Sequence, residues 1–112
     1  MPVPKREATI AINESLSTAV AIGGSALVGL IMPAAWTAAN ITLQGSHDGV
    51  TFNNVHTDDG TEKTITAAAS RYIALNPADY IGMDEIKLRS GTNAAAVTQA
   101  AARTITLVFQ SF

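Results

Sequence analysis

Two histidines and two acidic pairs are the residues of this 112-residue chain whose types suggest chemistry. His47 and His56 can meet across an expected hairpin, but the chain has no cysteine, and two imidazoles without further ligands fall short of a zinc set. Asp58-Asp59 and Asp84-Glu85 lie in or beside expected turns, where solvated carboxylates are common. Calcium needs about six or more oxygens in one cluster, and the spacing typical of calcium loops is absent. We expect no metal and no cofactor.

Catalytic signatures are missing as well. An activated nucleophile needs a base and a group that orients the base, and no motif such as G-x-S-x-G is present. A glycosidase can draw on two distant carboxylates, but this short chain offers little to build a substrate cleft around them. We therefore expect no catalytic residues and predict that the chain is not an enzyme.

The stretch from residue 41 to residue 55 contains His47 and leads directly to His56, Asp58 and Asp59. Residues 41–44 and 50–53 alternate between apolar and polar side chains, which is the period of a strand with one buried face. Between them, Asp48 and Gly49 tolerate the positive φ that tight turns require. The pattern predicts a β-hairpin around which the rest of the chain completes a sheet.

Similar short runs recur along the chain, separated by Gly, Pro, Asn and Asp. The pattern directs Ile10 and Ile12 inward and Arg89 outward, and the alanine-rich residues 91–102 suit either a helix or a loop. Eight or nine short strands predict an all-β fold, a single-domain β-sandwich of jelly-roll type. The expected strands are residues 8–12, 19–22, 26–32, 41–44, 50–53, 61–66, 71–75, 85–90 and 103–109.

Charge is the unusual feature of the composition. Charged residues make up 14% of the chain, against about 25% in typical soluble proteins. A surface of Thr, Ser, Asn, Gln and Ala is easily desolvated, which favours contact with other subunits. The net charge is −2 with the basic residues scattered, so we expect no nucleic-acid partner. No apolar run is long enough to span a membrane, and we expect no membrane partner.

The N-terminal segment, the loop around Trp36 and the loop of residues 93–102 hold the candidate contacts. Residues 1–7, which include Pro2 and Pro4, predict an extended N-terminal arm that precedes a domain of residues 8–112. Trp36 follows Pro33 in a loop, where it can be a lid over the core, a subunit contact or, together with Tyr80, a stacking platform for sugars.

Three segments carry a resemblance to a known group of proteins: the Pro-Ala-x-Trp loop at residues 33–36, Ser-x-Asp-Gly-x-x-Phe at residues 46–52, and Ile-Lys-Leu-Arg-Ser-Gly at residues 86–91. With Gln99 and the closing residues 103–109, they resemble small β-sandwich virion proteins of tailed bacteriophages. The resemblance runs from about residue 26 to the end. It implies a capsid decoration or cement protein, without enzymatic activity, on the virion surface and made in the host cytoplasm.

That resemblance implies the major capsid protein and further copies of the chain as partners, in a homotrimer or larger ring, and no small-molecule substrate. Two alternatives remain open: a carbohydrate-binding module of a receptor-binding fibre, because the Ser-x-Asp-Gly hairpin also resembles sugar-binding sandwiches, and a tail or collar adaptor. The candidate interaction residues are Pro2, Pro4, Lys5, Arg6, Trp36, Tyr80, Asn93 and Gln99.

Overall fold

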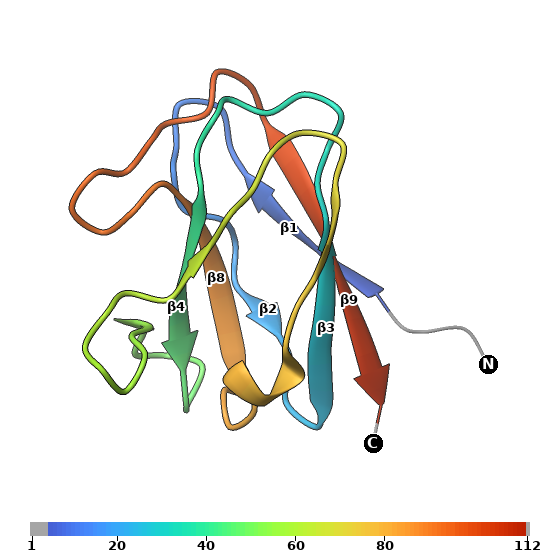
Figure 1. The fold of residues 1–112 in the computed structure, drawn as a ribbon, viewed down its shortest axis with the longest axis vertical. Helices are drawn as coiled ribbons and strands as arrows, with labels where there is room; N and C mark the ends of the chain where they lie inside the picture. The colour runs from blue at the N-terminus through green and yellow to red at the C-terminus, as the bar shows by residue number, and fades with distance from the viewer. Residues whose placement is uncertain (1–4, 112) are drawn as a thin grey trace.

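Two antiparallel sheets lie face to face in the computed structural model of the protein, which describes residues 5–111 (Figure 1). Every strand expected from the alternating pattern has a counterpart, and the all-β prediction is confirmed. The elements are β1 (Lys5–Ile10), β2 (Val20–Ala21), β3 (Ser25–Ile31), β4 (Ile41–Ser46), β5 (Asn53–Asn54), β6 (Thr64–Ile65), β7 (Tyr72–Ala74), the 3-10 helix η1 (Pro77–Asp79), β8 (Glu85–Ser90) and β9 (Arg103–Ser111).

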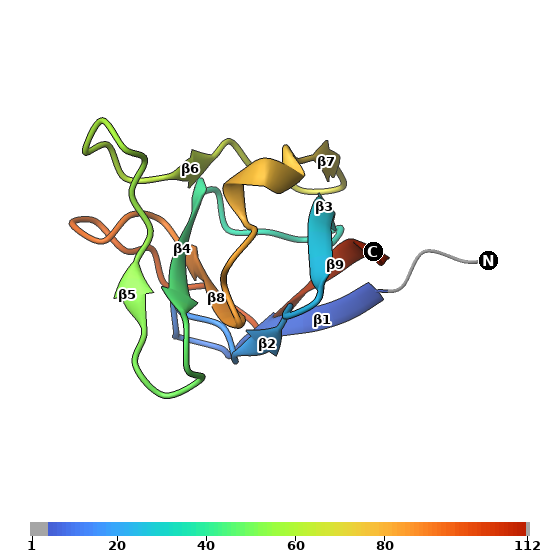
Figure 2. The ribbon, with the colours of Figure 1, turned by 90° about the horizontal axis from the view of Figure 1, so that it is seen from below.

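The strand order is that of a jelly roll. One sheet, here sheet A, has the order β1-β9-β3-β7, and sheet B has the order β2-β8-β4-β5, with β6 also paired to β4. The chain passes from one sheet to the other at nearly every connection, which yields the nested Greek keys of this architecture. Figure 2 shows the two sheets nearly end-on, with β7 as the last strand of sheet A.

The core lies between the two sheets and is formed by the apolar residues that alternate along each strand, as the sequence predicts. Ile86 and Leu88 on β8 and Ile105, Leu107 and Phe109 on β9 are completely buried between the sheets. Strands β8 and β9 belong to different sheets, so their inward side chains meet across the sandwich. Burial of these apolar side chains supplies about 1.5–3 kcal/mol each.

The hairpin of residues 41–55 is confirmed, but its loop is longer than expected. Gln44 pairs with Asn54, and β5 begins only at Asn53, so Val50 lies in the loop and is 82% exposed. The reason is Asp48, whose carboxylate accepts the backbone N–H groups of Val50 and Thr51, each at 2.9 Å. Because the Val50 and Thr51 N–H groups donate to the aspartate, they are not free to extend the hydrogen-bond ladder between β4 and β5.

Other boundaries also need correction. Ile12 was expected to face inward, yet it is 56% exposed, because β1 ends at Ile10 and Asn13 turns the chain with a φ of 66°. Residues 61–66 form a strand only at residues 64–65. Residues 91–102 form a loop without a helix. It starts at Gly91, whose φ of 90° and close contact with the backbone of Ala95 exclude a side chain.

The N-terminal boundary moves as well. Strand β1 begins at Lys5 and pairs with β9 from Lys5 to Ile10, so residues 5–7 belong to the sandwich and not to an arm. Their backbone groups find partners in β9, which is the physical reason for the correction. Pro2 and Pro4 lie outside the described residues.

Candidate functional site

Four loops gather at one end of the sandwich, the upper end in Figure 1: residues 11–19, 32–40, 66–70 and 91–102. We call these loops the neutral end, because Glu14 is their only charged residue, and alanine and threonine predominate. All four lie within the part of the chain that the structure describes. Burying a charge is costly unless it is paired, so a surface without charges is easily covered by another protein.

Gln99 holds the neutral end together from inside. Its side chain is 0% exposed. The Oε1 atom accepts hydrogen bonds from the Thr37 N–H at 2.9 Å and from Arg103 Nε at 3.1 Å. The Nε2 atom donates to the Thr37 carbonyl at 3.0 Å and to Ser90 Oγ at 2.6 Å. Gln99 was predicted as an interaction residue, but its complete burial makes it a positioning residue instead.

Backbone hydrogen bonds join the same loops. The Gln99 N–H donates to the Glu14 carbonyl at 2.9 Å, and the Asn13 N–H donates to the Gln99 carbonyl at 2.9 Å. The fourth loop is attached where the Ser70 N–H donates to the Pro33 carbonyl at 2.9 Å. These contacts fix the loops relative to one another, so little conformational freedom is left to lose on binding.

Trp36 and Asn93 belong to the neutral end. The Trp36 ring is half-buried against the core, and its Nε1 donates to the Ala39 carbonyl at 3.0 Å, which is the geometry expected of a lid. Asn93 is exposed, and its backbone N–H lies 3.2 Å from each carboxylate oxygen of Glu62. Of the predicted contact residues in these loops, Asn93 is therefore the one most available to a partner.

The remaining predicted interaction residues do not join this end. Tyr80 follows η1 and is only 2% exposed, and burial, with Asp79 nearby, raises the pKa of its phenol to about 12. Its ring therefore offers no face for a sugar, which corrects that prediction. Arg6 is exposed on β1, with its guanidinium carbon 4.7 Å from the centre of the Phe109 ring. Lys5 pairs with Val108 through the backbone.

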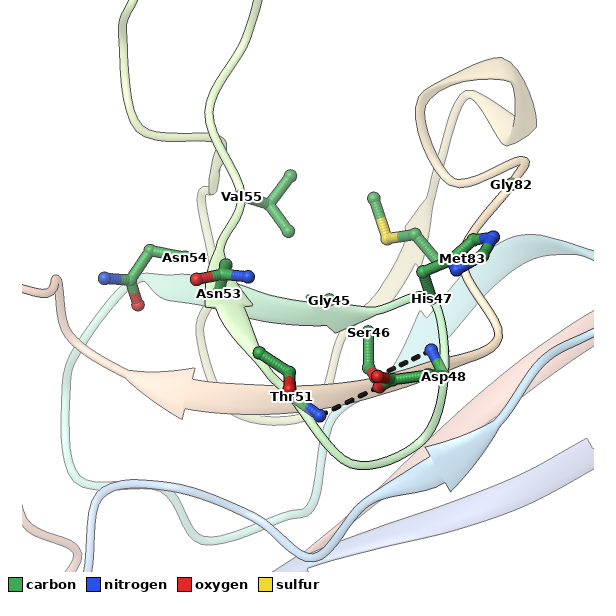
Figure 3. Close-up of a pocket in the computed structure, with 10 residues that line it drawn as sticks. All are labelled: Gly45, Ser46, His47, Asp48, Thr51, Asn53, Asn54, Val55, Gly82 and Met83. Atoms are coloured by element: carbon green, nitrogen blue, oxygen red, sulfur yellow. Dashed lines mark hydrogen bonds between the residues drawn. The ribbon is translucent and has the colours of Figure 1, made fainter.

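A hollow of about 570 Å³ lies at the opposite end of the sandwich, between β5 and the loop that precedes β8 (Figure 3). Its apolar floor is formed by Gly45, Val55 and Met83, whose sulfur would touch any side chain placed at Gly45. The polar groups at its edge are contributed by Ser46, His47, Asp48, Thr51, Asn53 and Asn54.

Ser46 and Asp48, beside the hollow, are occupied by their own loop. Ser46 Oγ accepts the Gly49 N–H at 2.8 Å and lies 3.1 Å from Asp48 Oδ1. The N–H groups of Thr51 and Val50 hold the pKa of Asp48 below its ordinary value. The pair therefore stabilises the hairpin loop, where a positive φ of 77° at Gly49 completes the turn.

Asp59 has the same role in the next turn. The Thr57 hydroxyl and the backbone N–H of Thr61 donate to its carboxylate and lower its pKa from 3.8 to about 2. Hydrogen bonds that favour the charged form of a carboxyl group also stabilise the folded state that makes them. The turns at Asp48 and at Asp59 are thus explained by local structure.

Replacing Asp59 with asparagine is expected to remove a pH-dependent part of the stability. The folded-state pKa lies below the ordinary 3.8, so the stabilisation is present above that value and is lost as the pH falls through about 2. Urea midpoints of both proteins measured between about pH 6 and pH 2 should therefore converge toward the acid end. Asp58→Asn is the matched control, and a difference that stays constant with pH would contradict this origin.

A charged network on the outer side of sheet B was not expected. Arg89 alternates outward as predicted, but it is only 6% exposed. Its guanidinium donates to Asn54 Oδ1 at 2.7 Å, and to Thr42 Oγ1 and Glu62 Oε2, both at 3.3 Å. The chain between β5 and β6 crosses this face and supplies Glu62. The alternation of side chains within β8 does not indicate which loop covers the strand. Sequence reasoning therefore missed the ion pair between Arg89 and Glu62.

The two histidines are held apart by the fold. His47 lies at the hollow of Figure 3, and His56 lines a separate hollow with Asp58, Lys63 and Asp79. Among residues 5–111, no three His, Cys, Asp or Glu side chains are grouped so that they could hold a metal ion. None of the described helical segments has the length and apolar character needed to span a membrane.

Comparison with known proteins gives no match to any protein family, to any curated protein or to any solved structure. Jelly rolls host many unrelated functions, among them capsid and lectin domains. The function must therefore be argued from the surface that this chain presents.

Proposed function

We propose that the chain is a structural protein of a tailed-phage virion, a capsid decoration or cement protein that joins neighbouring subunits through the neutral end. The observation that carries this proposal is the neutral end itself. Its four loops hold Glu14 as their only charge. The buried side chain of Gln99 joins residues 91–102 to residues 32–40, and backbone hydrogen bonds attach the other two loops. Depletion of charge is typical of the centre of protein interfaces.

The fold and the sequence resemblance agree with this role. A jelly roll has a rigid frame with loops at both ends, and the loops can be adapted to a partner without disturbing the core. The segments that resemble phage virion proteins include the Trp36 loop, which belongs to the neutral end, and the start of the loop that follows β8. The proposed partners are the major capsid protein and further copies of the chain.

The proposed mechanism is the covering of joints in a shell. Each bound copy adds buried area between two neighbours, and a stable protein interface buries about 1,600 Å² in total. Repetition over symmetric sites turns a modest contact into particle stability. A pre-formed neutral end lowers the cost of each contact, because its loops are already ordered by internal hydrogen bonds.

Placing a charge on the neutral end is expected to reduce incorporation into particles. Ala101 is exposed in the loop before β9, so Ala101→Glu should fold normally but leave a carboxylate without a partner in the contact. We expect its copy number on purified phage particles, measured by quantitative mass spectrometry, to fall about tenfold relative to the unaltered chain.

The matched control is Ala78→Glu, which adds the same charge to the exposed side of η1, at the opposite end of the sandwich. Its copy number should stay near that of the unaltered chain. Equal losses for both variants would contradict a contact at the neutral end. Absence of the unaltered chain from particles would contradict the virion role itself. The carbohydrate-binding alternative has less support, because Tyr80 is buried.

A further inference from the structure

Strand β7 leaves one edge of sheet A open. Among residues 5–111 it pairs with β3 alone, in a register that places Leu30 opposite Ile73. The Met32 N–H donates to the Arg71 carbonyl at 2.8 Å, and the Leu75 N–H donates to the Val28 carbonyl at 2.9 Å. Because backbone groups alternate in direction along an antiparallel strand, the N–H and C=O groups of Tyr72 and Ala74 point away from β3.

The side chains beside this edge are apolar and exposed. Tyr72 is 62% exposed, and Ile31, which pairs with it in β3, is 38% exposed. The Tyr72 ring lies over Gly29, since a Cβ atom placed there would sit 2.8 Å from the ring carbon Cε1. Ala74 is exposed and small. A large ring and a small residue therefore lie two positions apart on the same side of the strand.

We propose that β7 pairs with β7 of a second copy of this chain, antiparallel across a two-fold axis at Ile73, to join two A sheets into one continuous sheet. This register sets Tyr72 of each copy opposite Ala74 of the other. The open N–H and C=O groups of both residues then pair across the axis. Ile73 meets Ile73 of the second copy as the pair without mutual hydrogen bonds.

The edge is self-complementary in shape and charge, which identifies a second copy as its occupant. The large ring of Tyr72 meets the small Ala74, and Arg71 lies opposite Leu75, so no like charges face each other. Exposed edges are commonly protected by lysine, proline or a covering segment. Residues 72–75 contain neither of those residue types, and Figure 2 shows no described segment beyond β7.

This contact goes beyond the proposed role of the neutral end and is independent of it. A two-fold contact closes on itself, so any ring formed through the neutral end would be a separate interface. The pairing is tested on the purified chain without particles. Its failure would therefore leave the proposed function untouched, and failure of the proposed function would leave the pairing untouched.

The first test removes the donor that only the second copy would use. Ala74→Pro takes away an N–H that points away from β3, so the bonds between β3 and β7 remain, and proline is tolerated on an edge of this kind. By sedimentation equilibrium, we expect the dissociation constant of the dimer to rise at least about tenfold. Ala74→Lys should act in the same way, while Ala21→Lys, on the exposed edge strand β2, should have no effect.

The second test traps the pair directly. The chain has no cysteine, and residues opposite each other without mutual hydrogen bonds have Cα atoms about 4.5 Å apart, which suits a disulfide. Oxidised Ile73→Cys should form a covalent dimer of twice the 11.6 kDa chain mass at least about tenfold faster than Ala21→Cys. Equal rates would overturn the proposal, as would a monomeric unaltered chain at about 1 mM or an unchanged dissociation constant for Ala74→Pro.

Discussion

Replacing Glu62 with alanine is expected to destabilise the fold by about 3 kcal/mol, the lower part of the range for breaking a buried ion pair. Its carboxylate oxygen Oε2 lies 3.3 Å from Arg89 Nη1, and the side chains of Glu62 and Arg89 are only 17% and 8% exposed. Removing Glu62 leaves the guanidinium covered but without an opposing charge. The backbone N–H of Asn93 loses its acceptor as well.

Urea unfolding measures this loss, and a second ion pair provides the control. Lys63 Nζ lies 2.8 Å from Asp79 Oδ2, but these side chains are 24% and 39% exposed, so Lys63→Ala should cost less than about 1 kcal/mol. The shorter distance does not decide the outcome; burial does. The double variant Glu62→Leu, Arg89→Met should lose less stability than Glu62→Ala alone. Similar losses for Glu62→Ala and Lys63→Ala would contradict this account.

Replacing Gln99 with alanine is expected to cost about 2–4 kcal/mol and to loosen the neutral end. The change leaves the N–H and C=O groups of Thr37 without their partners and removes the donor to Ser90 Oγ, and Ser90 is completely buried. Each buried polar group left unsatisfied costs about 1–3 kcal/mol. A small cavity adds to the loss.

Two measurements separate this effect from general destabilisation. Urea unfolding gives the free energy, and amide hydrogen exchange under native conditions should show faster exchange in residues 32–40, which bond to the Gln99 side chain through Thr37, than in β8 and β9. Thr98→Ala, at an exposed neighbouring position, is the control and should stay within about 0.5 kcal/mol. A loss below about 1 kcal/mol for Gln99→Ala would show that the loops are held by other contacts.

Local pattern is enough to indicate the strands and the core. Ile86 and Leu88 alternate with charged neighbours in β8, and Ile105 and Leu107 of β9 follow threonines; all four are buried as that alternation indicates. Asn76 precedes Pro77, and its side chain accepts the Ala78 N–H at 3.2 Å at the start of η1. These features depend on residues a few positions apart, so the chain encodes them directly.

The candidate site could be predicted only in part from the local sequence pattern. The scarcity of charge in the loops around Trp36 and Asn93 can be read from the composition, but their gathering with residues 11–19 at one end depends on the strand order. Gln99 and Tyr80 were expected to face partners and are buried. Polar and aromatic side chains can be either buried or exposed, and the residues next to them in the sequence do not determine which of the two occurs.

The sequence by itself determined an all-β chain with a hydrophobic face on each long strand and unusually little charge. The tertiary structure alone decided that Arg89 is covered by Glu62, that Gln99 lies inside three loops, and that β7 is left with an open edge. The physical reason is the sequence separation over which each kind of interaction acts. Strand alternation acts between adjacent residues, whereas the covering of a sheet face depends on segments that long-range pairing brings across it.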